Sequence, residues 1–243
     1  VLIIDIDPQG NTTSGVGVEK ENLDATLYEL LLGDCDLSDC LIENVFENLS
    51  IIPSNVNLAG AEIELVGVED REFLLKNHID TIKDKYDFII MDCPPSLNIL
   101  TINAMTTADS VLVPIQCEYY ALEGLTQLIH TIELVQERLN PSLVIEGVVF
   151  TMYDARTNLS LQVVENVKSN LNQSISKLLY REMSVLQRRP VMVCPLHYMI
   201  KNLWEQRVTN SWQRKYYIRG MKNGSKKRWS WKRTGFHDSG YQC

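Results

Sequence analysis

The sequence predicts an α/β protein: a mostly parallel sheet with helices on both faces, which makes three layers. Continuous apolar runs, typical of strands that a parallel sheet buries on both faces, open the chain and recur before Asp92. Segments with helical periodicity alternate with such runs, which favours right-handed crossovers between parallel strands. The 243 residues, 45% of them hydrophobic, provide enough apolar material for one core.

Short apolar and β-branched runs bounded by turn residues predict the strands. These strands are expected at Val1–Ile4, Leu49–Pro53, Tyr86–Asp92, Ser110–Ile115 and Leu143–Phe150. The first and third runs show no alternation of polar and apolar residues, so both are expected to be buried on two faces. Each of these two strands leads into aspartates.

Longer segments with apolar residues three and four positions apart predict the helices. The helices are expected at Thr26–Leu32, Leu58–Val66, Glu69–Lys85, Leu97–Thr107, Leu122–Leu139 and Leu159–Leu171. The segment 69–85 is predicted to be one amphipathic helix with a charged outer face, and residues 33–39 a loop. Parallel sheets bind ligands at the carboxyl ends of their strands. We therefore expect the aspartates that follow the first and third strands to share one edge of the sheet.

Asp5 and Asp7 alternate after the first strand, and a polar, turn-forming string follows them as far as Thr13. The sequence offers no packing rationale for such carboxylates, and one of them could orient an attacking water, as phosphoryl transfer to water requires. The alternative for this string is a simple turn. Asp92 ends a hydrophobic strand, as the Mg²⁺-supporting aspartate of nucleotide hydrolases does. For Asp92 alone, helix capping or solvation is an equal alternative.

Charge divides the chain near Lys177. Residues 1–177 carry 9 Lys/Arg and 28 Asp/Glu, a net charge of −19, whereas residues 178–243 carry 14 and 3, a net charge of +11. We therefore expect an α/β domain over 1–177 and a basic, poorly ordered tail over 178–243. No apolar run approaches the roughly 20 residues of a membrane helix, so no membrane contact is expected. The six cysteines lack zinc-site spacing and are expected to be reduced, cytoplasmic thiols.

The first 177 residues resemble the ParA/Soj branch of the deviant-Walker ATPases, the group that also contains the MinD division-site proteins. The strings that carry the resemblance are Val1–Thr13, Ile51–Asn55, Leu58–Glu62, Tyr86–Leu97, Ala108–Asp109, Val113–Gly124 and Thr151–Thr157. The resemblance implies a P-loop NTPase-like fold and an ATP-dependent switch that partitions chromosomes or plasmids. It also implies ATP and Mg²⁺ as cofactors, a homodimer formed with ATP, nonspecific DNA binding, a stimulating ParB-like partner, and a cytoplasmic, nucleoid-associated location.

The resemblance further assigns roles to the acidic residues and the loop beside them. Asp7 would be the catalytic residue that positions the attacking water. Asp5 and Asp92 would support Mg²⁺, largely through water. The nucleotide-sensing loop would contain Gln9, Gly10 and Asn11.

Three further segments receive roles from the same resemblance. Pro94 and Pro95, together with Cys93, would form a second switch. Glu118–Tyr120 would lie near the dimer face. Arg156 would contact DNA or a partner, although an ordinary exposed arginine is the alternative reading.

The sequence departs from the family pattern in two places. The 243 residues contain no glycine- and lysine-rich phosphate loop after a strand, because residues 219–226 have the residue types but no strand before them. We therefore expect this chain to lack the first strand and P-loop, to bind ATP poorly and to be catalytically incompetent. After about residue 177 the family pattern ends, and a shifted reading frame with chosen synonymous codons restores it, so a frameshift is expected there.

Three other functions stay open at this point. A MinD-like cell-division regulator would need a C-terminal amphipathic membrane helix, which this sequence does not show. A nucleotide-free interaction module would use the sheet as a scaffold for partners. The charge of the tail is typical of a nucleic-acid binder, although an out-of-frame translation produces the same composition.

Overall fold

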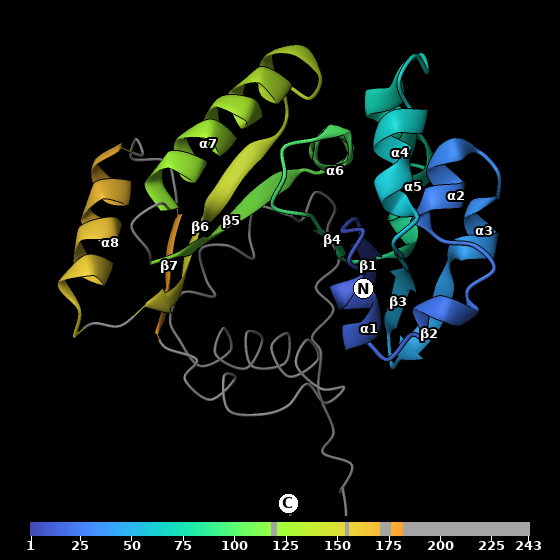
Figure 1. The fold of residues 1–243 in the computed structure, drawn as a ribbon, viewed down its shortest axis with the longest axis horizontal. Coiled ribbons are helices and arrows are strands. Elements are labelled where there is room, and N and C mark those ends of the chain that lie inside the picture. Colours follow the sequence, from blue (N-terminus) through green and yellow to red (C-terminus); the bar gives the residue numbers. More distant parts are fainter. Residues whose placement is uncertain (118–120, 154–155, 171–175, 182–243) are drawn as a thin grey trace, which may run out of the picture. The chain divides into compact units, whose positions relative to one another are not determined.

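The computed structural model describes residues 1–117, 121–153, 156–170 and 176–181, all of them within the unit Val1–His197. These residues form two sheets of mostly parallel strands with helices packed against them (Figure 1). The strand order is β2-β3-β1-β4 in the first sheet and β5-β6-β7 in the second. The predicted architecture of mostly parallel strands flanked by helices is confirmed, with the described strands divided between two sheets.

The first sheet is built around β1 (Leu2–Asp5), which pairs in parallel with β3 (Leu49–Ile52) on one side and β4 (Ile89–Asp92) on the other. The antiparallel edge strand β2 (Ile42–Phe46) pairs with β3 and was not predicted. All four residues of β1 are buried, because helices cover one face of the strand and the segment after α1 covers the other. The prediction of a first strand buried on both faces is confirmed.

Short helices connect the strands of the first sheet. Their bounds are α1 (Asn11–Gly15), α2 (Leu27–Leu32), α3 (Leu37–Cys40), α4 (Leu58–Glu64), α5 (Leu74–Ile79) and α6 (Ile99–Thr107), with the 3-10 turns η1 (Lys20–Asn22), η2 (Arg71–Phe73) and η3 (Lys83–Lys85). Local chemistry sets the ends of α2: Thr26 and Glu29 form a capping box at its start, and Gly33 ends it at a φ of 79°. The helices α1 and α3 were not predicted.

The prediction of one helix over residues 69–85 is wrong, since this segment folds as η2, α5 and η3. Two side chains of α6 explain the break at its start. Asn103 donates to the carbonyl of Arg71 at 2.8 Å and accepts from the amide of Leu75 at 3.1 Å, while Thr106 donates to the carbonyl of Glu72 at 2.6 Å. These bonds occupy backbone groups that a continuous helix would pair internally.

The prediction that the third strand is buried on both faces is also wrong. In β4, half-buried and exposed residues alternate. Ile89 and Met91 pack against the main core, whereas Phe88 and Ile90 are 59% and 46% exposed. Within the described part of the chain, β4 pairs only with β1, so one edge of the strand has no partner strand.

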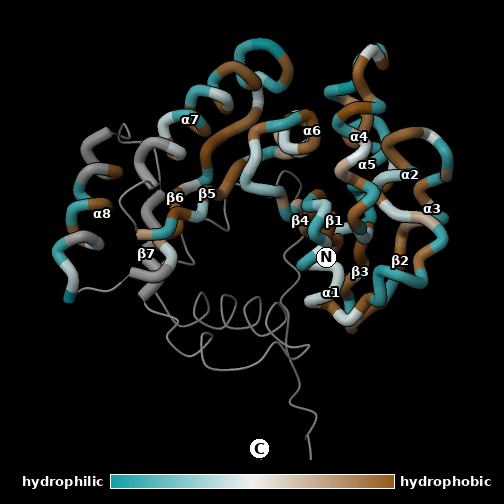
Figure 2. The backbone as a smooth tube through the Cα atoms, viewed as in Figure 1, coloured by the Kyte–Doolittle hydropathy of each residue, from teal (hydrophilic) through white to brown (hydrophobic). Residues whose placement is uncertain are grey.

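The second sheet is entirely parallel. Its strands are β5 (Ser110–Gln116), β6 (Val144–Tyr153) and β7 (Ser176–Arg181), and the helices are α7 (Ala121–Arg138) and α8 (Asn158–Asn170). Apolar side chains of β5, β6, α7 and α8 form one cluster, and hydrophobic residues run along β5 and β6 (Figure 2). Because β7 spans residue 177 and residues 182–243 lie outside the described residues, the predicted division of the chain into two domains stays a prediction.

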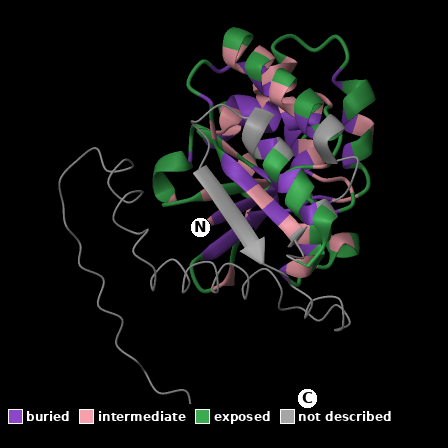
Figure 3. Ribbon diagram, turned by 90° about the vertical axis from the view of Figure 1, so that its left-hand side faces the viewer, coloured by how far each residue is buried: buried purple, intermediate pink, exposed green. Residues whose placement is uncertain are grey.

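The helix α6 contacts helices from both halves of the described chain. Its residues Leu100 and Ala104 belong to the core of the first sheet, and Met105 packs with Ile132 and Val135 of α7. Asn140, just after α7, donates from Nδ2 to the carbonyl of Met105 at 2.9 Å. Figure 3 shows buried residues on the strands and inner helix faces, with exposed residues outside. Of the helices that the structure describes, none combines the length and apolar character needed to cross a membrane.

Candidate functional site

The site is organised around Asp5, a fully buried carboxylate at the carboxyl end of β1. Its Oδ2 accepts from the amide and the hydroxyl of Thr13, both at 2.7 Å, and its Oδ1 accepts from the amide of Asp7 at 3.2 Å. Burial raises the pKa of Asp5, the Thr13 and Asp7 hydrogen bonds oppose this rise, and the negative charge of Asp92 adds to it. No ion pair to Asp5 occurs in the described part of the chain, so hydrogen bonds alone stabilise its charge.

Asp92 is the register partner of Asp5 on β4, and the two strands continue together because the amide of Ile6 donates to the Asp92 carbonyl at 2.8 Å. Unlike Asp5, Asp92 is exposed. Its Oδ2 accepts from the hydroxyl of Thr12 at 2.5 Å, and its Oδ1 accepts no hydrogen bond from any described residue. The predicted common edge for the two acidic strand ends is therefore present.

Asp7 lies two residues after Asp5, at the start of a tight turn. The amide of Gln9 donates to Asp7 Oδ1 at 2.9 Å, and the amide of Gly10 donates to the Asp7 carbonyl at 2.8 Å. Among the described residues nothing donates to Asp7 Oδ2, so this oxygen can accept from a water. Gln9 and Asn11 are exposed beside it.

Gly10 is required where it stands for two reasons. Its φ is 59°, in the left-handed region that disfavours other residues. A Cβ on Gly10 would also lie 2.8 Å from the backbone oxygen of Ser54 and 2.7 Å from Cδ of Lys20. The turn that presents Asp7 therefore packs tightly against neighbouring backbone.

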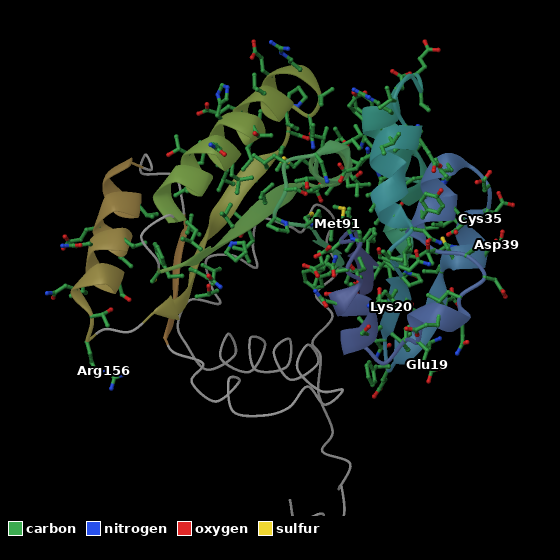
Figure 4. The ribbon with its side chains drawn as sticks, in the orientation of Figure 1. Glu19, Lys20, Cys35, Asp39, Met91 and Arg156 are labelled. Carbon is green, nitrogen blue, oxygen red and sulfur yellow. The ribbon has the colours of Figure 1, made fainter. Side chains whose placement is uncertain are left out.

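Four residues that the sequence analysis did not single out complete the site. The hydroxyl of Thr12 donates to Asp92, and the amide and hydroxyl of Thr13 donate to Asp5. The hydroxyl of Ser54 donates to the Asp7 carbonyl at 2.9 Å. Lys20 donates from Nζ to the Gln9 carbonyl at 2.7 Å, and Figure 4 labels it beside α1. The threonines and Ser54 lie inside strings quoted for the resemblance, so a signal was available for them, whereas Lys20 stands in an unremarkable polar stretch.

The proline pair that was expected to form a second switch follows β4 directly. Within the described residues, no hydrogen bond joins Cys93, Pro94 or Pro95 to the turn over residues 7–11. The side chain of Cys93 is exposed, and the pKa of its thiol is raised by desolvation and by the charge of the neighbouring Asp92.

Two other candidates are placed differently. Glu118–Tyr120 lie outside the described residues. Arg156 is exposed, and Figure 4 labels it beside the N-terminal end of α8.

The donor set suits Mg²⁺ better than a metal that needs several protein ligands. The described residues contain no group of three or more His, Cys, Asp or Glu that could hold a metal ion. Mg²⁺ keeps several waters and takes one or two carboxylates, which the free oxygen of Asp92 and the nearby Asp7 could supply. Three of the roughly four acceptor positions of the Asp5 carboxylate are already used by Thr13 and Asp7, so its support for a cation would pass through water.

Taken together, the fold and the site define an α/β protein with an acidic site at the carboxyl ends of adjacent parallel strands. Comparisons with known proteins agree with this class. Residues 1–145 match the AAA domain family. The sporulation initiation inhibitor protein Soj of Bacillus subtilis is 54% identical over 177 residues, which are 73% of this chain and 70% of that protein. The chromosome partitioning protein ParA of Myxococcus xanthus is 47% identical over 178 residues, which are 73% and 63% of the two chains.

A solved structure points the same way. Cobyrinic acid a,c-diamide synthase from Mycobacterium smegmatis, with bound ADP and magnesium, superposes with a TM-score of 0.66 at 38% identity, over 70% of this chain and 69% of that one. The chain belongs to the ParA/Soj family of partitioning ATPases, which are P-loop NTPases with an AAA domain.

Proposed function

We propose that this chain carries the water-activating half of an ATP-dependent partitioning switch. In this proposal the protein dimerises with ATP and then binds nonspecific DNA at the nucleoid, in the cytoplasm. A ParB-like partner stimulates hydrolysis and releases the DNA. The observation that carries the proposal is the register pair Asp5 and Asp92, with Asp7 two residues beyond, in a chain 54% identical to Soj.

Each residue of the site has a proposed task that its contacts support. Asp7 positions the attacking water through its free Oδ2, while the Gln9 amide and the tight turn at Gly10 hold its carboxylate in place. Asp92 offers a free, exposed oxygen to hydrated Mg²⁺, and buried Asp5 keeps Thr13 and the turn in register. When bound, ATP with Mg²⁺ would supply the phosphoryl group and neutralise its charge.

The surrounding segments would report the state of the nucleotide. Gln9, Gly10 and Asn11 lead directly into α1, so a movement of the turn would change the start of that helix. Pro94 and Pro95 would transmit a corresponding movement from Asp92 to α6. Mobility of either segment on ATP binding would be visible as a change in its amide exchange.

ATP binding by P-loop proteins depends on a phosphate loop. None of the 243 residues supplies a glycine- and lysine-rich loop behind a strand, and the backbone amides of such a loop hold the phosphates of ATP. A chain with such a strand and loop joined in front of Val1 is expected to bind ATP and hydrolyse it. Fluorescent-nucleotide titration and phosphate release would measure the two steps.

Asp7 provides the decisive variant. In the extended chain, Asp7→Ala is expected to lower kcat about 100-fold or more while ATP binding is retained, because only the positioned water is lost. Asp80→Ala, an exposed carboxylate paired with lysines on α5 and η3, is the matched control and should leave kcat unchanged. Full hydrolysis by the Asp7 variant would reject the catalytic assignment.

DNA binding is tested on the same extended chain. Affinity for a duplex of arbitrary sequence should appear with ATP, disappear with ADP and fall as salt is raised. If ATP is hydrolysed but no DNA is bound, the ATPase assignment stands and the partitioning assignment fails.

A further inference from the structure

The three most exposed large hydrophobic side chains in the described part of the chain lie on or beside α4. Ile63 is 78% exposed, Val56 73% and Val66 68%. Helical turns extend past both ends of α4, because the amide of Ala59 donates to Val56 and the amide of Val66 donates to Ile63. These exposed side chains therefore share one helical surface.

The exposed apolar residues follow helical spacing. The α4 stripe is defined as Val56, Ala59, Ile63 and Val66. Steps of three, four and three residues place these side chains on one face of a helix. The core residues Leu58, Ala61 and Leu65 are almost fully buried and occupy the opposite face. The helix is thus apolar on two opposed faces, and no contact from the described residues buries one of them, which is typical of an interaction surface.

Carboxylates border the α4 stripe. Glu62 and Glu64 flank it on either side, and Glu69 and Asp70 follow, whereas residues 55–70 contain no Lys, Arg or His. The inner two are held in place: Glu62 accepts from Asn98 Nδ2, and Glu64 accepts from the hydroxyl of Tyr28 at 3.0 Å. The stripe therefore lies between negative charges that are already ordered.

We propose that the α4 stripe binds a basic amphipathic helix of a partner protein. Apolar side chains of the partner would cover the stripe, and its Lys or Arg residues would face Glu62, Glu64 and Glu69. A second copy of this surface fits less well than a basic helix, because two copies would bring their acidic borders together. The contact uses neither the aspartates nor a nucleotide, so it does not depend on the proposed ATPase.

The test is a titration of the full 243-residue chain into a dye-labelled synthetic peptide. The peptide is an amphipathic helix with leucines on one face and lysines on its flanks. We expect saturable binding in the micromolar range that weakens as salt is raised. Ile63→Ser should weaken binding at least about tenfold, since it removes the centre of the stripe. Leu161→Ser, which changes a 44% exposed leucine on α8, is the matched control and should leave binding unchanged.

Further measurements separate the other occupants. Glu69→Gln should weaken binding about threefold without altering the apolar contact. Equal affinity for a peptide with glutamates in place of the lysines would overturn the proposal, as would equal binding by the Ile63→Ser chain. Sedimentation gives the last outcome: if the free chain dimerises and Ile63→Ser abolishes the dimer, the stripe is a self-association surface and the proposal is wrong.

Discussion

The adjacent strands β1 and β4 have the same kind of sequence, an apolar run that ends in aspartate, yet they are buried differently. β1 pairs with a strand on each side, whereas β4 pairs only with β1 among the residues that the structure describes. All four residues of β1 are buried, while β4 alternates between half-buried and exposed. The place of a strand in its sheet, rather than its composition, decides how much of it is buried.

Asp5 at the end of β1 and Asp92 at the end of β4 differ in burial in the same way as their strands. Asp5 is fully buried and accepts three hydrogen bonds, whereas Asp92 is exposed and accepts one. A buried carboxylate whose acceptor positions are largely used is suited to hold backbone in place. An exposed carboxylate with a free oxygen is suited to meet water or a cation. One sequence signature therefore provides a structural and a ligand-facing residue.

The largest effect is expected from apolar truncation in β1. Ile4→Ala should lower the free energy of unfolding by about 2–5 kcal/mol, because Ile4 is completely buried and leaves a cavity. Ile90→Ala on β4, where the side chain is 46% exposed, should cost less than about 1 kcal/mol. Urea denaturation of both variants measures the two losses in free energy of unfolding. Equal losses would contradict the difference in burial between β1 and β4.

The aspartates give the next largest difference. Asp5→Asn should destabilise the fold by about 1–3 kcal/mol, because the one amide oxygen can accept both Thr13 hydrogen bonds only by turning its NH2 group toward the Asp7 amide, which is then left unpaired. Asp92→Asn keeps an oxygen for Thr12 and should change stability by less than about 0.5 kcal/mol. Chemical denaturation gives both values. A neutral effect at Asp5 would show that the Asp7 amide finds another acceptor.

The turn after β1 can be tested with two glycines that share a left-handed backbone. Gly33→Ala should cost about 1 kcal/mol from backbone strain alone, because no atom lies within 4 Å of the added Cβ. Gly10→Ala adds a clash with the Ser54 carbonyl and should cost roughly 1 kcal/mol more. The difference in stability between the two variants, measured by thermal and urea unfolding, gives the cost of the clash with Ser54. Equal losses of stability would show that the turn relaxes to accommodate the added Cβ.

The smallest effect is expected at Lys20, whose bond to the Gln9 carbonyl is local. Lys20→Met should leave global stability nearly unchanged but raise amide exchange about threefold in peptides covering residues 9–14. Lys83→Met removes a comparable surface contact, to Asp80, and should leave those peptides unchanged. Unchanged exchange in the Lys20 variant would show that Gly10 packing alone holds the turn.

Much of the fold was predictable because its signals are local. The apolar runs of β1, β3, β5 and β6 and the long periodic segments of α7 and α8 lie where they were expected, to within a few residues. The segment 69–85 was not predictable, because Asn103 and Thr106 of α6 bond to its backbone from some thirty residues away. The short edge strand β2 depends on β3 for its hydrogen bonds and carries little signal of its own.

The site divides in the same way. Residue types and spacing were sufficient to bring Asp5, Asp7 and Asp92 to one edge, because parallel strands must end together. Lys20 could not be found from its neighbours in the chain, since its partner, the Gln9 carbonyl, is a backbone group eleven residues earlier. The sequence alone thus determined most of the strands, the acidic edge and the family. Only the tertiary structure decided which aspartate is buried, because burial depends on how many neighbours a strand has, and hydrogen bonds between distant segments are not encoded locally.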